Sequence, residues 1–594
     1  MRTASDEDAG LRLALLAVLV GIIAGGGAVI FRSMIGLFHN LFLTGTLSWH
    51  YDANVHTPAG PLGPWIILVP VGAALVVAFL VKNFAPEAKG HGVPEVMDAI
   101  YYNRGVIRPI VALIKSLASA ISIGSGGSVG REGPMIQIGS SFGSTVGQWI
   151  RMPDWQRITL VGCGAAGGLS ATFNTPLAGL LFAIELIVPE TSARTLIPIA
   201  IATGSATFIS RLAFGNNPSF HVPQLVVPPE EVFSPGLLLV YLFFGLALGL
   251  VAWLYIRAIY WCEDLFDGMP GNYYTRHALG MLLVGVMMYL FMRHFGHYYV
   301  EGVGYATVQQ ALEGVLTDPY LLVLIFLGKL AATSLTLGSG ASGGIFSPSL
   351  YLGAALGSLY SLAVNAVAPG LHIATVNLAI VGMAGVVGGA TGAVLTAIVM
   401  TFEMTRDYHV IIPLILTVSM AYGIRRMLLR DSIYTFKLTR RRHYIPDSLH
   451  TNLYMMRRTL DVLDTPVHQI EADQPLSSLR TAMRSRRRIP HLIVTREGTL
   501  RGILSAERHA ALLVNPGGDT ERAVESFAAR EYTVVRQNDL IFDVVAKLRA
   551  AGNDIAVVTA DGTLDRPEDV LGIITLGDIA RNSNFLRQMQ RQRS

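Results

Sequence analysis

The sequence predicts an all-α polytopic membrane domain made of two repeated halves with broken helices, followed by a small α/β domain. Three observations lead to this prediction: an uneven distribution of charge, a series of apolar runs, and an internal repeat. The chain has 594 residues, of which 52% are hydrophobic and 14% charged, and its mean hydropathy is +0.48. Soluble proteins carry about 25% charged residues. The composition therefore excludes a disordered chain, a nucleic-acid-binding protein and a disulfide scaffold.

Charge divides the chain into two parts. The long stretch 1–438 holds 44 of the Asp, Glu, Lys and Arg side chains, and the much shorter stretch 439–594 holds nearly as many, 42. We therefore expect a membrane domain over 1–438, a linker over 439–458 and a soluble domain over 459–594. The two cysteines, Cys163 and Cys262, lie in apolar runs without partners at metal-ligand spacing, which favours small buried side chains over a metal site.

Apolar runs follow one another through the first part, with glycine or proline between them. Several are too short or too broken for a simple span of about 20 residues. Residues 330–402 contain no Asp, Glu, Lys or Arg. Such a chain must satisfy its backbone inside the protein, which is typical of a channel or transporter with interrupted helices. The runs are 11–30, 65–81, 107–123, 157–187, 195–213, 236–260, 278–294, 320–337, 349–368, 373–402 and 410–424.

An internal repeat relates residues 11–215 to residues 230–438. Gly124-Ser-Gly-Gly127 returns as Gly338-Ser-Gly-Ala341, Phe182-Ala-Ile-Glu185 as Met400-Thr-Phe-Glu403, and Gly90-His-Gly92 as Gly302-Val-Gly304. The offsets in residue number are 214, 218 and 212, and the segments come in the same order along the chain. Repeats with interrupted helices place a substrate site near the bilayer midplane, where the halves meet.

Basic residues crowd just after the last apolar run, which predicts that this end faces the cytosol. The soluble domain is then cytoplasmic. The arginine-rich composition and the absence of a recognisable targeting segment favour a bacterial inner membrane. The basic residues are Arg425, Arg426, Arg430, Arg440, Arg441 and Arg442.

The first candidate site lies at Gly130-Arg131-Glu132-Gly133-Pro134. Pro134 suits the first turn of a helix, and the glycines let an anion approach free backbone N–H groups. Glu132 would compete with that anion when charged and yield when protonated. A carboxylate that simply pairs with Arg131 or caps the helix is the alternative.

The matching segment of the second half is Gly344-Ile345-Phe346-Ser347-Pro348, which has no charge near it. Main-chain N–H groups and helix dipoles bind a small anion without holding it as tightly as a fixed Lys or Arg. Paired with Glu132 by the repeat, this segment predicts the other wall of an anion site.

Together with Gly90-His-Gly-Val-Pro-Glu95 and Ser432-Ile-Tyr434, these segments resemble the signature sequences of the CLC family of chloride channels and chloride/proton antiporters. The resemblance implies a homodimer in the lipid bilayer, with one pathway for chloride or similar small anions in each inverted-repeat subunit. It implies that Glu132 is the gating glutamate and that the N–H groups of Ile345 and Phe346 and the Tyr434 hydroxyl bind the central anion. Gly130, Arg131, Gly133 and Gly344 belong to the same anion-binding segments. No enzymatic activity, metal or cofactor is expected.

Two residues depart from the family pattern. His91 stands where the family usually has an anion-coordinating serine, so it either lines the inner pathway or turns away while the backbone binds the anion. Leu186 stands where the family's antiporters have a proton-carrying glutamate. A voltage-gated-type chloride channel is therefore the main expectation. The alternative is a chloride/proton antiporter with a non-standard proton path, through Glu185 or a water chain.

The soluble part alternates short β-type and helical runs in two copies, at about 459–515 and 525–585. Gly502–Arg508 and Gly572–Asp578 sit at equivalent places in the two copies. The pair resembles tandem CBS domains. This resemblance implies an adenine nucleotide on Thr575 and Asp578, or a purely structural pair, since Arg508 replaces the acid of the first copy.

Three other functions compete with this prediction. Gly340-Ala-Ser-Gly343 resembles the nucleophile box of rhomboid intramembrane proteases, with His372 or His409 as the base, although both histidines lie near likely helix ends. A transporter of a larger organic ion would need more polar residues in the core. The fluoride-exporting branch of the family fits Pro134 and Tyr434 less well.

Overall fold

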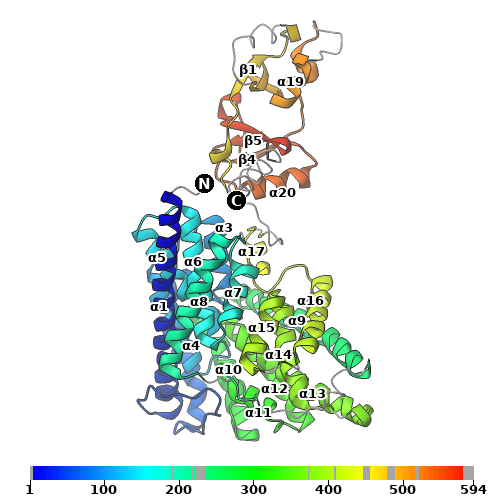
Figure 1. The fold of residues 1–594 in the computed structure, drawn as a ribbon. Helices are drawn as coiled ribbons and strands as arrows, with labels where there is room; N and C mark the ends of the chain where they lie inside the picture. The colour runs from blue at the N-terminus through cyan, green and yellow to red at the C-terminus, as the bar shows by residue number, and fades with distance from the viewer. Residues whose placement is uncertain are drawn as a thin grey trace. The chain divides into compact units, whose positions relative to one another are not determined.

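The structure is a computed structural model that forms two compact units, Ala4–Leu449 and His450–Ser594 with Met1–Thr3. It describes residues 4–579 except 190, 217–218, 223–234, 372, 407, 409, 444, 446–454, 456, 478–488 and 515–520. The larger unit is helical, and the smaller one contains all the strands of the described residues (Figure 1). Each unit is considered by itself.

The first half of the larger unit contains eight α-helices, some joined by short 3-10 or π-helical turns. In chain order the elements are α1 (Ala4–His39), η1 (Asn40–Thr44), η2 (Gly63–Ile67), α2 (Leu68–Phe84), η3 (Pro86–Ala88), α3 (Val93–Tyr102), α4 (Ile110–Gly124), α5 (Glu132–Trp149), α6 (Asp154–Phe173), α7 (Pro176–Phe182), η4 (Ala183–Ile187) and α8 (Ala193–Phe214).

The second half of the larger unit repeats this pattern of long and short helices. Across the described residues of both halves, eight helices are long and apolar enough to cross a membrane. The second-half elements are α9 (Pro235–Gly268), α10 (Tyr273–Phe295), α11 (Tyr305–Leu312), α12 (Pro319–Gly338), α13 (Phe346–Val367), η5 (Pro369–Leu371), α14 (Thr375–Thr391), α15 (Val394–Thr405), α16 (Ile411–Leu428) and α17 (Thr435–Arg440).

Two runs predicted as continuous, 157–187 and 373–402, are each broken into two helices. Helix α6 ends at Asn174, which adopts a left-handed conformation with φ 62°, and Pro176 starts α7. Helix α14 ends in the same way at Gly392, with φ 81°, before α15. Proline lacks the N–H that would continue the first helix and suits the start of the next one. The offset between the two breaks equals that between Glu185 and Glu403, so the repeat extends to the breaks.

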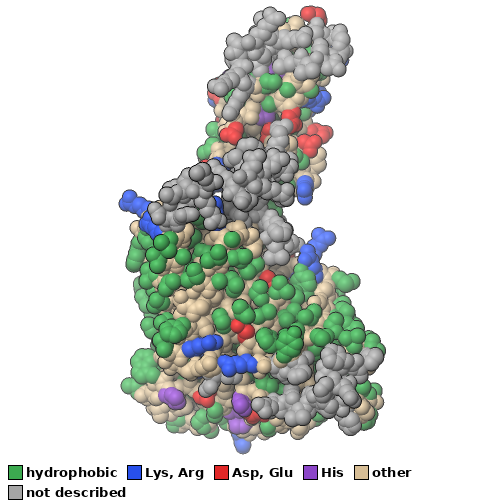
Figure 2. Space-filling model, viewed as in Figure 1, with side chains coloured by type: hydrophobic (Ala, Val, Ile, Leu, Met, Phe, Trp, Pro, Cys, Tyr) green, Lys and Arg blue, Asp and Glu red, His purple; other side chains and the backbone are tan. Residues whose placement is uncertain are grey.

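The surface of the larger unit is apolar, as a lipid-facing surface must be. Hydrophobic side chains are spread over its visible face in Figure 2, and few charged side chains lie among them. Large side chains such as Phe208, Phe243 and Leu283 are exposed on helices long enough to span a bilayer. This surface and the eight long helices identify an integral membrane protein.

Glycine pairs let the central helices of each half touch backbone to backbone. A Cβ on Gly139 of α5 would overlap the carbonyl of Gly164 on α6, and the reverse also holds. Gly353 of α13 and Gly382 of α14 make the same contact in the second half. Without side chains between them, helices approach closely enough for dispersion contacts to replace a hydrophobic driving force.

Two crossed hydroxyl pairs join the halves about a pseudo-two-fold relation. Ser119 bonds Ser342 at 2.9 Å, and Ser128 bonds Thr333 at 3.1 Å. The offset that relates Gly124 to Gly338 also relates Ser119 to Thr333 and Ser128 to Ser342, so each pair is the image of the other. The repeat in the sequence therefore corresponds to a pseudo-two-fold symmetry of these side-chain contacts.

The described residues of the smaller unit form two three-stranded sheets of the same topology. In each sheet the first strand pairs parallel with the second, and the second antiparallel with the third. The predicted strands at 491–494 and 555–558 lie in β2 and β5, and the predicted helix at 540–550 is α20, whereas 478–484 of the helix predicted at 477–484 lies outside the described residues. The elements are η7 (Leu460–Val462), β1 (Val467–Glu471), β2 (His491–Arg496), β3 (Thr499–Leu504), α19 (Ala506–Val514), η8 (Val524–Phe527), β4 (Thr533–Arg536), α20 (Ile541–Ala551), β5 (Ile555–Thr559), η9 (Pro567–Asp569) and β6 (Gly572–Thr575).

Candidate functional site

Glu132 is buried at the first residue of α5, where that helix meets the start of α13. Its carboxylate accepts hydrogen bonds from the Tyr305 hydroxyl at 2.5 Å and from the Ser347 hydroxyl at 2.7 Å. Its side chain is fully buried, and Pro134 lies in the same first turn. The alternative interpretation, in which Glu132 pairs with Arg131, is not supported by the contacts of these two described residues, since the Arg131 guanidinium lies over the Tyr305 ring at 5.1 Å.

Gly130 and Gly344 form a small antiparallel bridge between the halves. The Gly130 N–H donates to the Gly344 carbonyl at 2.7 Å, and the Gly344 N–H donates to the Gly130 carbonyl at 2.6 Å. This differs from the expectation that both N–H groups point at an anion, because the bridge uses them to join the two helix starts. Gly133 is also a packing residue here, since a Cβ on it would overlap the His91 carbonyl.

Ile345 and Phe346 lie at the start of α13, as the capping residue and the first helical residue. The first N–H groups of a helix have no carbonyl partner within it and carry its positive partial charge. Both side chains are buried, and the Phe346 ring packs against Phe182 at 5.9 Å. The α13 first turn therefore offers N–H groups for an anion, whereas the N–H groups of Gly130 and Gly344 are already bonded to each other's carbonyls.

His91 and Tyr434 lie side by side, with ring centroids 5.7 Å apart. The Tyr260 hydroxyl donates to the Ile433 carbonyl at 2.6 Å, so it accepts from His91 Nε2 at 3.3 Å. A neutral His91 then carries its proton on Nε2 and leaves Nδ1 as an acceptor. His91 Nδ1 and the Tyr434 hydroxyl are buried and have no partner among the described residues.

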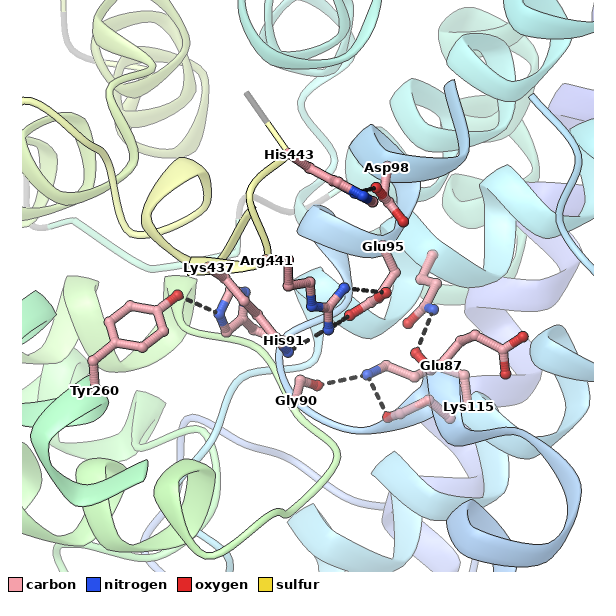
Figure 3. A network of polar contacts seen from close by, with 12 residues as sticks. Glu87, Gly90, His91, Glu95, Asp98, Lys115, Tyr260, Lys437, Arg441 and His443 are labelled. Carbon is pink, nitrogen blue, oxygen red and sulfur yellow. Dashed lines mark hydrogen bonds and ion pairs between the residues drawn. The ribbon is translucent and has the colours of Figure 1, made fainter. Parts of the chain in front are cut away.

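A polar network ties α3 to α17 beside His91 (Figure 3). Arg441 binds both oxygens of Glu95 at 2.7 and 3.0 Å, and Lys437 Nζ lies 3.6 Å from the same carboxylate. His443 contacts Asp98 one turn further along α3. His91 precedes α3 and Tyr434 precedes α17, so this network fixes the two segments that carry them.

Two buried lysines, which lie inside the apolar runs 107–123 and 320–337, were missed in the sequence. Lys115 donates to the carbonyls of Ala88 and Gly90 at 3.0 and 2.7 Å. Lys329 donates to the carbonyls of Val300 and Gly302 at 3.2 and 2.8 Å. Neither has an ion pair within the described part of the chain, and the two are related by the same offset as Gly124 and Gly338. Each lysine holds the loop before a short helix, α3 or α11.

Glu185 and Glu403 cap each other's helices. Glu185 accepts from the N–H groups of Leu395 and Thr396, at the start of α15, at 2.8 and 2.7 Å. Glu403, near the end of α15, accepts from the N–H groups at the start of α7 at 3.1 and 2.8 Å. The two helices therefore run antiparallel, as in an inverted repeat. Leu186 follows Glu185 in η4, and its alkyl side chain offers no carboxyl group that could bind a proton.

A cavity of about 630 Å³ includes Arg131, the residue before Glu132, in its lining. It is lined by Arg131 and Tyr305, which contact each other, and by Arg32 from α1. Arginine side chains raise the local concentration of anions in a cleft. The cavity therefore places two arginine side chains where they can attract an anion, one of them in the residue that precedes α5.

Asp578 caps the helical turn after β6 through Thr575. Its carboxylate accepts from the Thr575 N–H at 3.0 Å and from the Thr575 hydroxyl at 2.7 Å. The two predicted nucleotide-binding residues are therefore in contact with each other. In the matching turn of the first copy, the Arg508 N–H bonds Ser505 at 3.3 Å.

Ser342, the nucleophile of the protease alternative, bonds Ser119 and the Ala88 carbonyl at 2.9 and 2.7 Å. These contacts belong to the symmetric hydroxyl pairs that join the halves. Its proposed bases, His372 and His409, lie outside the described residues.

Two solved structures have a similar fold. A slow cyanobacterial Cl⁻/H⁺ antiporter has a TM-score of 0.62 and 26% identity, and the match covers 72% of this chain and 98% of that one. A eukaryotic CLC transporter has a TM-score of 0.61 at 19% identity, with 96% of this chain and 98% of the other covered. The second match shows a likeness of fold that includes the smaller unit.

Curated relatives and a family model give the same result from sequence. The H(+)/Cl(−) exchange transporter ClcA of Cronobacter sakazakii is 33% identical over 442 residues, which are 73% of this chain and 91% of the relative. A ClcB-like chloride channel protein of Ralstonia nicotianae is 33% identical over 389 residues, 64% of this chain and 87% of the relative. The family described as voltage gated chloride channel matches residues 73–426, more than half of the chain. This membrane protein therefore belongs to the CLC family of chloride channels and transporters.

Proposed function

We propose that this chain is a chloride/proton antiporter whose gate is Glu132. The observation that carries the proposal is the place of Glu132, a buried carboxyl at the point where the first turns of α5 and α13 meet. A carboxylate there competes with an anion for the same positive helix ends, and protonation releases it. One group thereby couples the movement of an anion to that of a proton.

Exchange is favoured over passive conduction by the relatives. ClcA of Cronobacter sakazakii, named an exchange transporter, matches this chain over 91% of its own length. Leu186 argues for conduction, because an alkyl side chain binds no proton. The proposal therefore requires a proton path that reaches Glu132 without a carboxyl at position 186, through Glu185 or through water.

The anion is chloride, held by the N–H groups at the start of α13 and by the Tyr434 hydroxyl. The N–H groups of Ile345 and Phe346 lie in the unpaired first turn. The Tyr434 hydroxyl is buried and has no partner among the described residues, so an anion would satisfy it. Arg131 lies over Tyr305 at the cavity and attracts anions toward the gate.

The decisive experiment measures the reversal potential of purified full-length protein in liposomes. Under a fixed chloride gradient, an exchanger shifts its reversal potential when a pH gradient is added, whereas a passive chloride conductor does not. We expect the shift in the natural protein and its loss in Glu132→Gln, which keeps the shape of the side chain but binds no proton. Glu403→Gln, a carboxyl on α15 that caps α7, serves as the control and should keep the shift.

We further propose that the protein works as a homodimer in a bacterial inner membrane, with residues 439–594 in the cytosol. Arg426 in the last turn of α16 and Arg430 after it support this orientation, because positive residues favour the cytosolic side. Arg425 does not contribute to the charged surface, since it is buried and donates to the Gly389 carbonyl at 2.7 Å. Cross-linking in native membranes tests the dimer, and protease accessibility in inside-out vesicles tests the orientation.

An adenine nucleotide at Thr575 and Asp578 is a proposal for the smaller unit. The two side chains form a capped turn in the second copy, whereas the first copy has Arg508 in place of the acid. Titration of the full-length protein with ATP, ADP and AMP in a calorimeter tests it, with Asp578→Asn as the control. No heat with any of the three would contradict nucleotide binding.

A further inference from the structure

Two hydroxyl groups from the second half of the membrane unit donate hydrogen bonds to the Glu132 carboxylate. Tyr305, the first residue of α11, donates at 2.5 Å, and Ser347, in the first turn of α13, donates at 2.7 Å. The hydroxyls lie 3.2 Å from each other. All three side chains are buried, so water does not compete for these hydrogen bonds.

The Tyr305 ring is held in place from two sides. The Arg131 guanidinium lies 5.1 Å from its centroid, and the Phe220 ring packs edge-on at 4.9 Å. Tyr305 also lines the cavity that Arg131 and Arg32 line. A fixed donor of this kind loses little conformational entropy when it bonds the carboxylate, so more of the bond energy holds Glu132 in place.

The repeat indicates that these hydroxyls serve Glu132 rather than the scaffold. The position that matches Ser347 in the first half is Gly133, and the one that matches Tyr305 is Val93. Neither carries a hydroxyl, and the residue that matches Glu132 is Phe346, which needs none. The two hydroxyl groups, in the second half, and the carboxyl group that they bind, in the first half, therefore occur only on one side of the repeat each.

We propose that Tyr305 and Ser347 are positioning residues that hold the Glu132 side chain in the anion pathway and so set how strongly it competes with chloride. The proposal rests on the proposed role of Glu132 as the gate. While both hydroxyls bond the carboxylate, an incoming anion must displace it against two charged hydrogen bonds. These two hydrogen bonds would therefore slow the replacement of the carboxylate by an anion and weaken apparent chloride binding.

The test measures chloride binding by calorimetry on the purified full-length protein. Tyr305→Phe and Ser347→Ala each remove one hydroxyl and nothing else from the contact. A hydrogen bond to a charged group contributes about 1.5–3 kcal/mol, which corresponds to roughly tenfold or more in an equilibrium constant. We expect each variant to bind chloride about tenfold more tightly than the natural protein.

The same substitutions in a Glu132→Gln background separate this role from a structural one. With no carboxylate to hold, Tyr305→Phe and Ser347→Ala should leave chloride binding unchanged relative to Glu132→Gln alone. Tyr360→Phe and Ser361→Ala are matched controls on α13, because their hydroxyls donate to the carbonyls of Val240 and Ser358. Neither control should alter chloride binding in either background.

Three results would overturn the proposal. Unchanged chloride binding in both hydroxyl variants would show that the hydroxyls do not hold the gate. An equal change with and without Glu132 would show that they act on the anion site itself. If Glu132→Gln alone altered neither chloride binding nor proton coupling, the proposed gate would fail, and the inference with it. Since each hydroxyl variant tests the idea independently, one that does not elute as a folded protein leaves the other to decide.

Discussion

The two halves of the membrane unit share their scaffold but not their chemistry. Lys115 and Lys329 hold equivalent loops by donating to backbone carbonyls, and Glu185 and Glu403 cap each other's helices. The glycine contacts between α5 and α6 return between α13 and α14. These features stabilise a helix arrangement that is the same on both sides of the pseudo-two-fold relation.

The differences gather where the halves meet. Glu132 of the first half faces Ser347 and Tyr305 of the second, while their counterparts are Phe346, Gly133 and Val93. His91 is likewise matched by Val303. The residues at which the two halves of a duplicated scaffold meet can differ without changing the scaffold. Here one half carries the ionisable group, and the other half carries the groups that bind it.

The largest effect is expected when the buried lysines are removed. Lys115→Met and Lys329→Met keep the length of the side chain but remove its ammonium donor. The carbonyls of Val300 and Gly302 lose the donor that they have in Lys329. The carbonyls of Ala88 and Gly90 still accept from the Ser342 hydroxyl and from the Gly343 N–H. Each unsatisfied buried group costs about 1–3 kcal/mol. Lys329→Met should lower the stability of the protein by about 3 kcal/mol and Lys115→Met by about 1 kcal/mol, both seen as a fall in the midpoint of thermal unfolding in detergent.

Lys82→Met is the control, since this lysine lies in the last turn of α2 and its ammonium group makes no bond to a loop carbonyl in the described chain. Tolerance of one buried-lysine substitution and not of the other would break the equivalence of the two halves.

A smaller loss is expected from the reciprocal caps. Glu185→Gln and Glu403→Gln each replace a charged acceptor by a neutral one at a helix start, which costs about 1–2 kcal/mol. Thermal unfolding should show similar losses for the two variants. Reversal potentials of both variants sharpen the comparison, because loss of proton coupling in Glu185→Gln alone would give Glu185 a role that Glu403 lacks.

Much of the scaffold can be predicted from the sequence, because apolar runs and repeated glycines are local signals. The offset between Gly124 and Gly338 also relates Lys115 to Lys329, so these lysines could have been found by applying it to every charged residue. The break at Asn174 had a signal too, since Pro176 follows closely. Helix α5 was absent from the predicted runs because its glycines and serines lower its hydropathy.

The hydrogen bonds from Tyr305 and Ser347 to Glu132 could not be predicted from the sequence. Tyr305 lies 173 residues from Glu132 and Ser347 lies 215 residues away, and no local pattern reports a contact over that distance. A tyrosine or serine in an apolar segment is usually a core or helix-facing residue. The pairing of Gly130 with Gly344 was missed for a related reason, because a glycine N–H looks the same in the sequence whether it bonds an anion or a carbonyl.

A moderate effect on selectivity is expected at His91. His91→Ser replaces the imidazole next to Tyr434 by a short hydroxyl donor, so the ratio of chloride to nitrate transport should change several-fold, an effect on the order of 1 kcal/mol. Val303→Ser makes the same change at the matching position and should leave the ratio unaltered. Anion flux from liposomes measures both. A change in Val303→Ser as large as in His91→Ser would show that the two loops are functionally alike.

The smallest effect is expected in the soluble unit, where the comparison of repeats continues. His509 is buried and matches Ile579, which is buried in the second copy. Its Nδ1–H donates to the Pro490 carbonyl at 3.1 Å, and its Nε2 has no partner among the described residues. Burial lowers the pKa of His509 below 6.5, so the folded state prefers the neutral ring.

Protonation of His509 would bury a charge on Nε2, whereas the unfolded chain accepts the same proton freely. The folded form is therefore favoured above pH 6.5 and loses stability as the pH falls through that value toward the lowered pKa. Hydrogen exchange across α19, corrected for the intrinsic rate, should show less protection at pH 5.5 than at pH 7.5. His509→Ile copies the second repeat and should abolish this difference. Persistence of the pH effect in the variant would assign it to a group other than His509.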